Sequence, residues 1–359
     1  MRIVISAGGT GGHIYPALAI INKIKEKEPN SEVLYIGTHN RMEKDIVPKC
    51  GIPFKSIEVY GISKNILKTI KALNCFRKAT KECEKIISEF KPDVVIGVGG
   101  YVTAPVLRAA SKLGIKTFIH EQNSIPGKAN RYLARKVDLI GTSFRSSIEY
   151  FSNNKVIFTG NPCSESAKSA VPMSKSEYNL SKDKKLVLFV MGSLGSSKMN
   201  EILIRTMPKF EGKDYEVLFV TGKGGYESVK DIKFPSNVVV VPYIENMAKM
   251  LKNTDLIVSR AGASTISEII ALQIPSILIP SPYVPNNHQY KNALDMIQND
   301  ACVVIKEEAV SSSLLVSEVD NLINDEERIN RFKTNLSKLG IDDSATLIYE
   351  SLVKLIDRK

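Results

Sequence analysis

A run of glycines with one histidine behind it is the feature of this chain best suited to chemistry. Residues 6–16 read SAGGTGGHIYP and follow the first apolar run of the sequence. Few side chains stand before a helix that we expect to begin near Tyr15, so backbone N–H groups can approach an anionic or sugar-bearing ligand at the positive end of that helix. His13 adds an imidazole, which exchanges protons near neutral pH. A plain tight turn between strand and helix fits the same glycines.

A second group of this kind occupies residues 255–270, DLIVSRAGASTISEII. An apolar strand is expected to end before Gly262, and a helix to start near Ser264 and Thr265. The free N–H groups and hydroxyls of such a helix start suit a diphosphate. Glu268, one turn later, is spaced to accept two hydrogen bonds from a ribose diol. A capping box formed by the same hydroxyls and Glu268 is the alternative interpretation.

Three further strand ends carry polar groups. Residues 120–124, HEQNS, place acid–base and amide groups on one loop, where Glu121 either acts on substrate or only holds His120 or a backbone turn. Tyr101 follows a glycine-rich strand end in GVGGYVTAP, and Ser193 offers a hydroxyl in MGSLGSS. Each of these signals is weak alone, because polar turns are common.

The elements that must position these groups alternate along the whole chain. Continuous apolar, β-branched runs separated by helical patterns indicate parallel sheets that are buried on both faces. There are too many runs for one compact sheet, so we predict an α/β protein with two doubly wound Rossmann-like domains facing each other across a cleft. The predicted strands are 2–6, 32–37, 54–59, 93–99, 116–121, 138–143, 156–160, 185–192, 215–222, 237–243, 255–262, 275–280 and 301–307.

The domain boundary is predicted within residues 161–184, a polar stretch rich in Ser and Lys that has the composition of a linker. We therefore assign residues 1–160 to an N-terminal domain and 161–340 to a C-terminal domain. Residues 341–359 have the apolar spacing of an amphipathic helix, which we expect to return toward the N-terminal domain and pack across the domains.

Composition narrows the function classes. At 359 residues the chain is long enough for two domains of roughly 150 residues each. Its five cysteines are scattered, which disfavours a disulfide framework and fits a reducing cytosol. The first apolar run is too short for a signal peptide, and no run approaches the roughly 18 residues of a membrane span. The net charge of +11 indicates an anionic partner.

Much of that charge gathers in one segment. Residues 59–81 contain six Lys or Arg and no acid, interleaved with apolar residues at helical spacing, and residues 125–137 add four more basic residues. A basic helix with an apolar face suits an anionic membrane surface. A core-facing stripe with a solvated basic face is the alternative. Nucleic acid fits less well, since aromatic residues are only 7% and Trp is absent.

Metal ligands and cofactor motifs are not expected. The sequence has no D-x-D, and its four histidines lie far apart. We therefore predict no metal and no cofactor, so helix dipoles and hydroxyls must replace a divalent ion at any diphosphate.

Seven segments occur in the order and spacing of one family: AGGTGGHIYPALAI, GVGGYVTAP, HEQNSIPGKAN, TGNP, YIENM, SRAGASTISEI and HQYKNA. They resemble the MurG-type peptidoglycan N-acetylglucosaminyltransferases over nearly the whole chain. The resemblance implies the GT-B fold and inverting transfer of N-acetylglucosamine from UDP-GlcNAc to undecaprenyl-diphosphate-linked muramyl-pentapeptide, forming a β-1,4 bond. It also implies an acceptor- and membrane-facing N-terminal domain, a UDP-sugar-binding C-terminal domain, and peripheral attachment at the cytoplasmic face of the cell membrane through the basic helix around 62–81.

The resemblance also assigns roles to residues. From the residues themselves, His13 is expected at the chemical centre, as base or as orienter of the attacking hydroxyl, with His120 and Glu121 as its rivals. The other expected substrate contacts are Thr10, Gly11, Gly12, Tyr101, Asn123, Ser193, Ile244, Ala263, Ser264, Thr265, Ile266, Ser267, Glu268 and Gln289. One position departs from the family, which commonly has an arginine where this chain has Ser164. Either that charged contact is missing in this chain or another basic residue, such as Arg260 or Lys198, supplies it.

Three other functions remain open. An NAD-dependent oxidoreductase has a similar glycine-rich turn, but the second strand ends Tyr35-Ile36-Gly37-Thr38 without the acidic residue that such a site requires. A non-catalytic, membrane-recruiting subunit that binds sugar nucleotides would keep the donor site without a base. A UDP-sugar:diacylglycerol glycosyltransferase belongs to the same family as the MurG-type enzymes, uses the same class of donor and also associates with membranes.

Overall fold

The computed structural model describes residues 1–61, 66–151, 155–192 and 195–357, without the side chains of residues 66–68. The chain divides into two compact units. Unit 1 combines Met1–Cys163 with Asp343–Lys359, and unit 2 comprises Ser164–Asp342. These borders lie within three residues of the predicted ones at 160/161 and 340/341.

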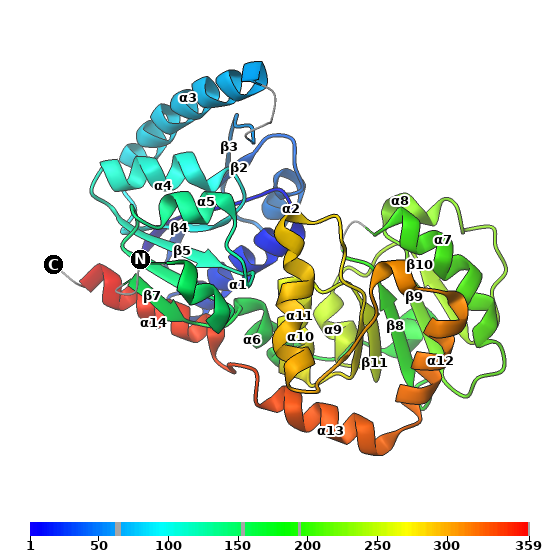
Figure 1. The fold of residues 1–359 in the computed structure, drawn as a ribbon. Helices are drawn as coiled ribbons and strands as arrows, with labels where there is room; N and C mark the ends of the chain where they lie inside the picture. The colour runs from blue at the N-terminus through cyan, green and yellow to red at the C-terminus, as the bar shows by residue number, and fades with distance from the viewer. Residues whose placement is uncertain (62–65, 152–154, 193–194, 358–359) are drawn as a thin grey trace. The chain divides into compact units, whose positions relative to one another are not determined.

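Unit 1 is built on a parallel sheet flanked by helices (Figure 1). Among the described residues its strand order is β3-β2-β1-β4-β5-β6-β7, and each neighbouring pair is parallel. The order reverses between β1 and β4, so the loops that follow these two strands meet at the switch point where such folds bind ligands. The strands are β1 (Arg2–Ala7), β2 (Glu32–Thr38), β3 (Phe54–Ile57), β4 (Val94–Gly99), β5 (Lys116–Glu121), β6 (Leu139–Thr142) and β7 (Val156–Phe158).

Helices cover both faces of this sheet. Successive side chains of a strand point to opposite faces, so Ile3 and Ile5 of β1 pack into one core cluster and Val4 into another. The first cluster contains residues of α1 and of the C-terminal helix α14, including Leu352, and the second contains residues of α3 and α4. The helices are α1 (Gly11–Lys27), α2 (Glu43–Lys49), α3 (Ile66–Phe90), α4 (Thr103–Lys112), α5 (Lys128–Leu133) and α14 (Ser344–Asp357).

Unit 2 repeats the design with a second parallel sheet. Its strand order among the described residues is β10-β9-β8-β11-β12-β13, which reverses between β8 and β11. The strands are β8 (Leu186–Val190), β9 (Glu216–Val220), β10 (Val238–Val241), β11 (Leu256–Ser259), β12 (Ser276–Leu278) and β13 (Val303–Val304). The helices are α7 (Ser197–Thr206), α8 (Lys223–Tyr226), α9 (Met247–Leu251), α10 (Ala263–Leu272), α11 (His288–Gln298), α12 (Ser312–Ile323) and α13 (Glu326–Ser337).

The predicted architecture of two doubly wound parallel sheets is confirmed, and a strand overlaps each predicted range. Two local predictions are wrong. The first helix begins at Gly11 instead of near Tyr15, because extended Thr10 ends the turn and glycine is tolerated in a first turn whose N–H groups lack helical partners. The stretch 161–184 is not a plain linker, since it contains α6 (Pro162–Ser169) and a short 3₁₀-helix with a Ser174–Glu177 capping box.

Candidate active site

The two glycine-rich turns of unit 1 touch through their backbones. The N–H of Gly8, after β1, donates to the carbonyl of Gly99, at the end of β4, over 3.2 Å. A Cβ atom at Gly100 would lie 2.4 Å from the carbonyl oxygen of Gly8, so a side chain there would collide with the backbone. The two turns therefore form one continuous surface at the switch point of the sheet.

The N-terminus of α1 emerges from this surface. Its N-cap residue Thr10 makes no side-chain capping bond, and the N–H groups of Gly11 and Gly12 in the first turn have no helical acceptors. Thr10 and Gly12 are exposed. Gly11 is buried, and the three residues form a helix N-terminus instead of a loop, so their contact with a ligand stays a prediction.

A buried carboxylate that the sequence analysis missed holds the first turn in place. Glu43, fully buried at the start of α2, accepts hydrogen bonds from the N–H of Gly9 at 3.1 Å and from the N–H and hydroxyl of Thr38 at 3.0 and 2.6 Å. A Cβ atom at Gly8 would lie 2.4 Å from one of its oxygens. The sequence gives no sign of this role, because Glu43 stands in a charged segment that looks solvated.

His13 lies in the first turn of α1, half-buried. Its Nδ1 is 3.0 Å from Oε1 of Gln122. The Gln122 amide nitrogen in turn lies 2.9 Å from Nδ1 of His120, whose Nε2 lies 2.9 Å from the carbonyl oxygen of Gly160. The structure thus joins two histidines that are far apart in the sequence, through one of the amide side chains of the HEQNS loop.

The carboxylate of Glu121 is fully engaged in its own loop. It is 1% exposed and accepts hydrogen bonds from the N–H groups of Asn123 and Gly127 and from both amide side chains of Asn123 and Asn130, at 2.9 to 3.3 Å. Such a group orders the loop after β5 and presents Asn123. The geometry favours this positioning role over direct proton transfer.

Tyr101 stands half-buried just before α4. It packs against the core cluster that contains α3 and α4, and its contact with the Arg41 guanidinium raises the pKa of Arg41. Tyr101 thus follows directly on the glycine surface, beside the turn that carries Gly99 and Gly100.

In unit 2, the start of α10 has unused polar groups. Its N-cap is Gly262, which has no side chain to cap the helix, so the capping box that the sequence allowed is not formed. The Ser264 hydroxyl is buried and has no hydrogen-bond partner among the described residues. Glu268, half-buried one turn later, forms no hydrogen bond or ion pair with any residue that the structure describes, and burial raises its pKa to about 7. Unused donors and an unused carboxyl on one helix start are what a bound diphosphate and ribose require.

The other residues expected to contact substrate at the start of α10 differ in how far they are buried. Ala263 and Ile266 are buried, whereas Thr265 and Ser267 are half-buried. The Ser267 hydroxyl donates to the carbonyl of Ala263, which removes it as a free donor.

Ser193 lies outside the described residues. The described end of the same turn, Ser196, caps α7 and accepts a hydrogen bond from Arg260 at 3.1 Å. Arg260 also pairs with buried Glu307 over 2.6 Å, and Lys198 pairs with the same carboxylate over 3.1 Å. The two cations proposed to replace the family arginine therefore share Glu307, and Arg260 supports the turn through Ser196.

Two further expected contacts have free hydrogen-bonding groups. Ile244 follows β10 with its side chain buried, and its backbone N–H and carbonyl bond to no residue that the structure describes. Oε1 of Gln289 accepts from the N–H of Ser281 at 2.8 Å, which fixes the amide with its nitrogen as the remaining donor.

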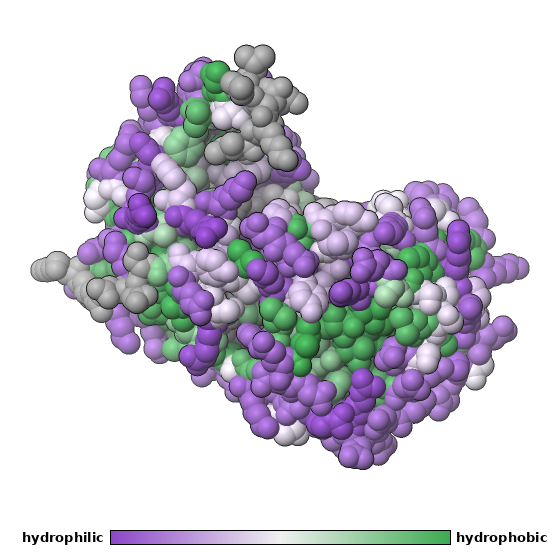
Figure 2. Space-filling model, in the orientation of Figure 1, coloured by the Kyte–Doolittle hydropathy of each residue, from purple (hydrophilic) through white to green (hydrophobic). Residues whose placement is uncertain are grey.

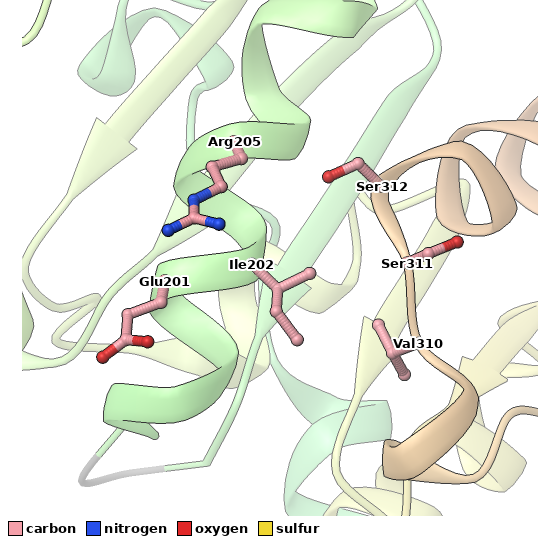
Figure 3. A pocket seen from close by; sticks show the side chains of 6 residues that line it. All are labelled: Glu201, Ile202, Arg205, Val310, Ser311 and Ser312. Atoms are coloured by element: carbon pink, nitrogen blue, oxygen red, sulfur yellow. The ribbon is translucent and has the colours of Figure 1, made fainter.

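A cavity of about 230 Å³ lies elsewhere in unit 2, between α7 and the residues before α12 (Figure 3). Figure 3 shows Glu201 and Arg205 projecting from α7 on one side and Ser311 and Ser312 on the other. None of the expected substrate contacts lines it. Within the described ranges, no cluster of three or more His, Cys, Asp or Glu could hold a metal ion, and no helix could cross a membrane.

Comparison with known proteins establishes the family of the chain. The glycosyltransferase family 28 N-terminal domain matches residues 3–142, and the family 28 C-terminal domain matches residues 186–348. Over the full length of both chains, the sequence is 44% identical to the UDP-N-acetylglucosamine–N-acetylmuramyl-(pentapeptide) pyrophosphoryl-undecaprenol N-acetylglucosamine transferase 1 of Bacillus cereus. It is also 44% identical to the Bacillus subtilis transferase of that name, covering 99% of each chain.

Solved structures agree. The crystal structure of Acinetobacter baumannii MurG matches with a TM-score of 0.76 at 26% identity, covering 98% of this chain and 99% of that one. The resemblance seen in the sequence motifs is thereby confirmed. The chain belongs to glycosyltransferase family 28, among the UDP-N-acetylglucosamine–N-acetylmuramyl-(pentapeptide) pyrophosphoryl-undecaprenol N-acetylglucosamine transferases.

Proposed function

We propose that the protein transfers N-acetylglucosamine from UDP-GlcNAc to the muramyl-pentapeptide carried on undecaprenyl diphosphate, in the synthesis of peptidoglycan precursors. The observation that carries this proposal is the full-length identity of 44% to a transferase named for that activity. No metal and no cofactor enters the proposal.

The donor is assigned to unit 2. The diphosphate takes the uncapped start of α10, where the buried hydroxyl of Ser264 has no partner among the described residues and the helix dipole favours negative charge. Ionised Glu268 accepts both hydroxyls of the ribose, and the free backbone of Ile244 reads the uracil edge. The Gln289 amide nitrogen donates to the sugar.

The acceptor and the proton transfer are assigned to unit 1. His13 takes the proton of the attacking muramyl hydroxyl while that oxygen bonds to the anomeric carbon from the face opposite the diphosphate. The bond between the anomeric carbon and the phosphate oxygen breaks, and its electron pair leaves with UDP. One displacement of this kind inverts the configuration and yields a β-1,4 bond. Glu121 positions Asn123 for the donor sugar through their shared hydrogen bonds.

A membrane-facing surface is assigned to α3 and α5 of unit 1. On α3 the apolar side chains of Ile70 and Leu73 are 52% and 49% exposed, next to exposed Lys71. Figure 2 shows hydrophobic and hydrophilic residues interspersed over this part of unit 1. Exposed apolar residues among lysines and arginines fit the headgroup region of an anionic membrane. We therefore propose peripheral attachment at the cytoplasmic face, where the lipid-linked acceptor is held. Lys64 of the predicted basic segment lies outside the described residues.

Transfer assays test the proposal. Purified protein is incubated with radiolabelled UDP-GlcNAc and either a short-chain lipid-linked muramyl-pentapeptide or diacylglycerol in mixed micelles. We expect label in the muramyl product alone. Label in diacylglycerol alone would replace the proposed acceptor, and UDP binding without transfer to either acceptor would indicate the non-catalytic subunit.

A further inference from the structure

His13 belongs to a line of hydrogen-bonded groups that we call the relay. The group at its far end determines which atom donates and which accepts in each of its hydrogen bonds. The relay runs from His13 through Gln122 and His120 to the backbone carbonyl of Gly160, with contacts of 3.0, 2.9 and 2.9 Å. His120 is fully buried and Gln122 is 1% exposed, so water does not compete for these bonds. Each group must therefore pair a donor with an acceptor.

The direction follows from Gly160. A carbonyl oxygen only accepts, so Nε2 of His120 carries a proton and donates it. Burial lowers the pKa of His120 to about 4, which keeps its ring neutral and leaves a lone pair on Nδ1. The Gln122 amide nitrogen must donate to that lone pair, and its second proton goes to the His120 carbonyl at 3.0 Å.

The amide orientation then decides the tautomer of His13. With both N–H groups of Gln122 directed at His120, its oxygen is the atom that faces His13. An amide oxygen only accepts, so Nδ1 of His13 carries the proton. The lone pair of the neutral ring is consequently on Nε2.

We infer that His120 and Gln122 are positioning residues that hold His13 in the Nδ1–H tautomer, so that Nε2 is the atom that accepts a proton from the acceptor hydroxyl. The inference rests on the proposed function for the identity of that hydroxyl. When the proton arrives, both ring nitrogens of His13 carry hydrogen, and the Nδ1–H bond to the Gln122 oxygen becomes a charge-assisted one. The relay thus orients the neutral ring and stabilises its charged form, without itself giving up or gaining a proton.

The glycine surface completes this arrangement. A Cβ atom at Gly99 would lie 2.5 Å from Nδ1 of His13, the atom that faces Gln122. The absence of a side chain at Gly99 therefore leaves the space that the ring needs to reach the amide. Three separate segments of unit 1 thus fix one imidazole.

Nitrogen-15 NMR of the histidine rings tests the tautomer directly and without catalysis. Long-range proton–nitrogen spectra of the full chain distinguish Nδ1–H from Nε2–H rings, and His13→Ala assigns the signals among the four histidines. We expect Nδ1–H for His13 and Nε2–H for His120. An Nε2–H ring at His13 in the unaltered protein would overturn the inference.

Two variants of Gln122 sharpen the test. Gln122→Leu removes the acceptor, so His13 should lose its preference for Nδ1–H, and kcat should fall by about 10²-fold or more with KM for UDP-GlcNAc nearly unchanged. Gln122→Glu keeps an acceptor oxygen and should keep a proton on Nδ1 of His13, which covers the case in which the leucine variant does not fold. Loss of that proton in the glutamate variant would contradict the relay.

Ser147→Ala is the matched control, because it removes another buried hydrogen bond of unit 1, to the carbonyl of Phe144. The tautomers of His13 and His120 should be unchanged in this variant. A changed tautomer of His13 in Ser147→Ala would mean that its ring responds to any loss of stability. The NMR measurement of the tautomer and the transfer assay test different claims, so each can fail without the other. An Nδ1–H ring in a protein that transfers no sugar would keep the relay and reject the proposed function.

Discussion

A Cβ atom at Gly99 would lie 2.5 Å from Nδ1 of His13, closer than two such atoms can approach. The Gly99 backbone also has a φ of +111°, a conformation that side chains disfavour. Gly99→Ala should therefore displace the His13 ring and lower kcat by about 10²-fold or more, toward the loss expected for a missing base. Steady-state kinetics at saturating UDP-GlcNAc and acceptor measure this, and UDP binding by calorimetry should stay unchanged.

Gly114→Ala is the control for backbone strain. Gly114 also has a positive φ, at +70°, but no atom lies within 4 Å of its hypothetical Cβ. Both variants should lose about 1–3 kcal/mol of stability through strain. A similar fall of kcat in both would mean that strain, and not the position of His13, limits the reaction.

Glu268 should make UDP binding depend on pH. Burial raises the pKa of Glu268 to about 7, so below that pH the unliganded carboxyl is mostly protonated. The ionised carboxylate is the form that accepts two ribose hydroxyls, so binding must release this proton at low pH, and UDP affinity should rise between about pH 6 and 8. Calorimetry in two buffers with different ionisation enthalpies detects the proton.

Glu268→Gln separates this effect from ionisation of the UDP phosphates. At about pH 8 the variant should bind UDP more weakly by about 1.5–3 kcal/mol, and its affinity should keep only the pH dependence of the ligand. Equal affinity of the two proteins at high pH would remove Glu268 from the ribose.

The sequence predicts the strands and helices better than it predicts the contacts within the candidate site. Runs of apolar, β-branched residues predict strands such as β5, Lys116–Glu121, because both faces of a parallel sheet are buried. The start of α1 was misplaced by four residues, since glycines resemble a turn even when they form a first helical turn. The sequence did not indicate Glu43 or the role of Gln122, because both depend on partners from other strands, and periodicity does not reveal which strands become neighbours.

The pair of Arg260 and Glu307 should be important for the stability of unit 2. Their side chains are 8% and 1% exposed and lie 2.6 Å apart. Glu307→Gln leaves the Arg260 charge buried without its partner, which should lower the free energy of unfolding by about 3–5 kcal/mol. Urea denaturation followed by circular dichroism measures the change.

Glu227→Gln provides the comparison, because Glu227 pairs with Lys230 at side-chain exposures of 73% and 46%. An exposed pair contributes about 0–1 kcal/mol, so this variant should unfold almost like the unaltered protein. Equal losses in the two variants would contradict the account of Arg260 as a buried charge that Glu307 neutralises.

Attachment to membranes should depend on the basic residues of α3. Lys71→Glu with Lys78→Glu reverses two exposed charges and should reduce binding to anionic vesicles, while UDP binding persists. Sedimentation with vesicles should show attraction that fades as salt rises, since screening at 0.15 M acts over about 8 Å. Lys209→Glu with Lys233→Glu changes the same charge on unit 2 and should bind like the unaltered protein. An equal loss in both double variants would indicate a response to net charge alone.

The measurement that tests the central claim most directly is the rate of the chemical step in His13→Ala. Rapid-quench experiments with saturating UDP-GlcNAc and lipid-linked muramyl acceptor report this rate, and His39→Ala, which alters an exposed histidine of the same unit, is the control. The account predicts a fall of about 10²–10⁴-fold for His13→Ala, with donor affinity little changed, and none for His39→Ala. A His13→Ala enzyme within a few-fold of the unaltered rate would contradict it.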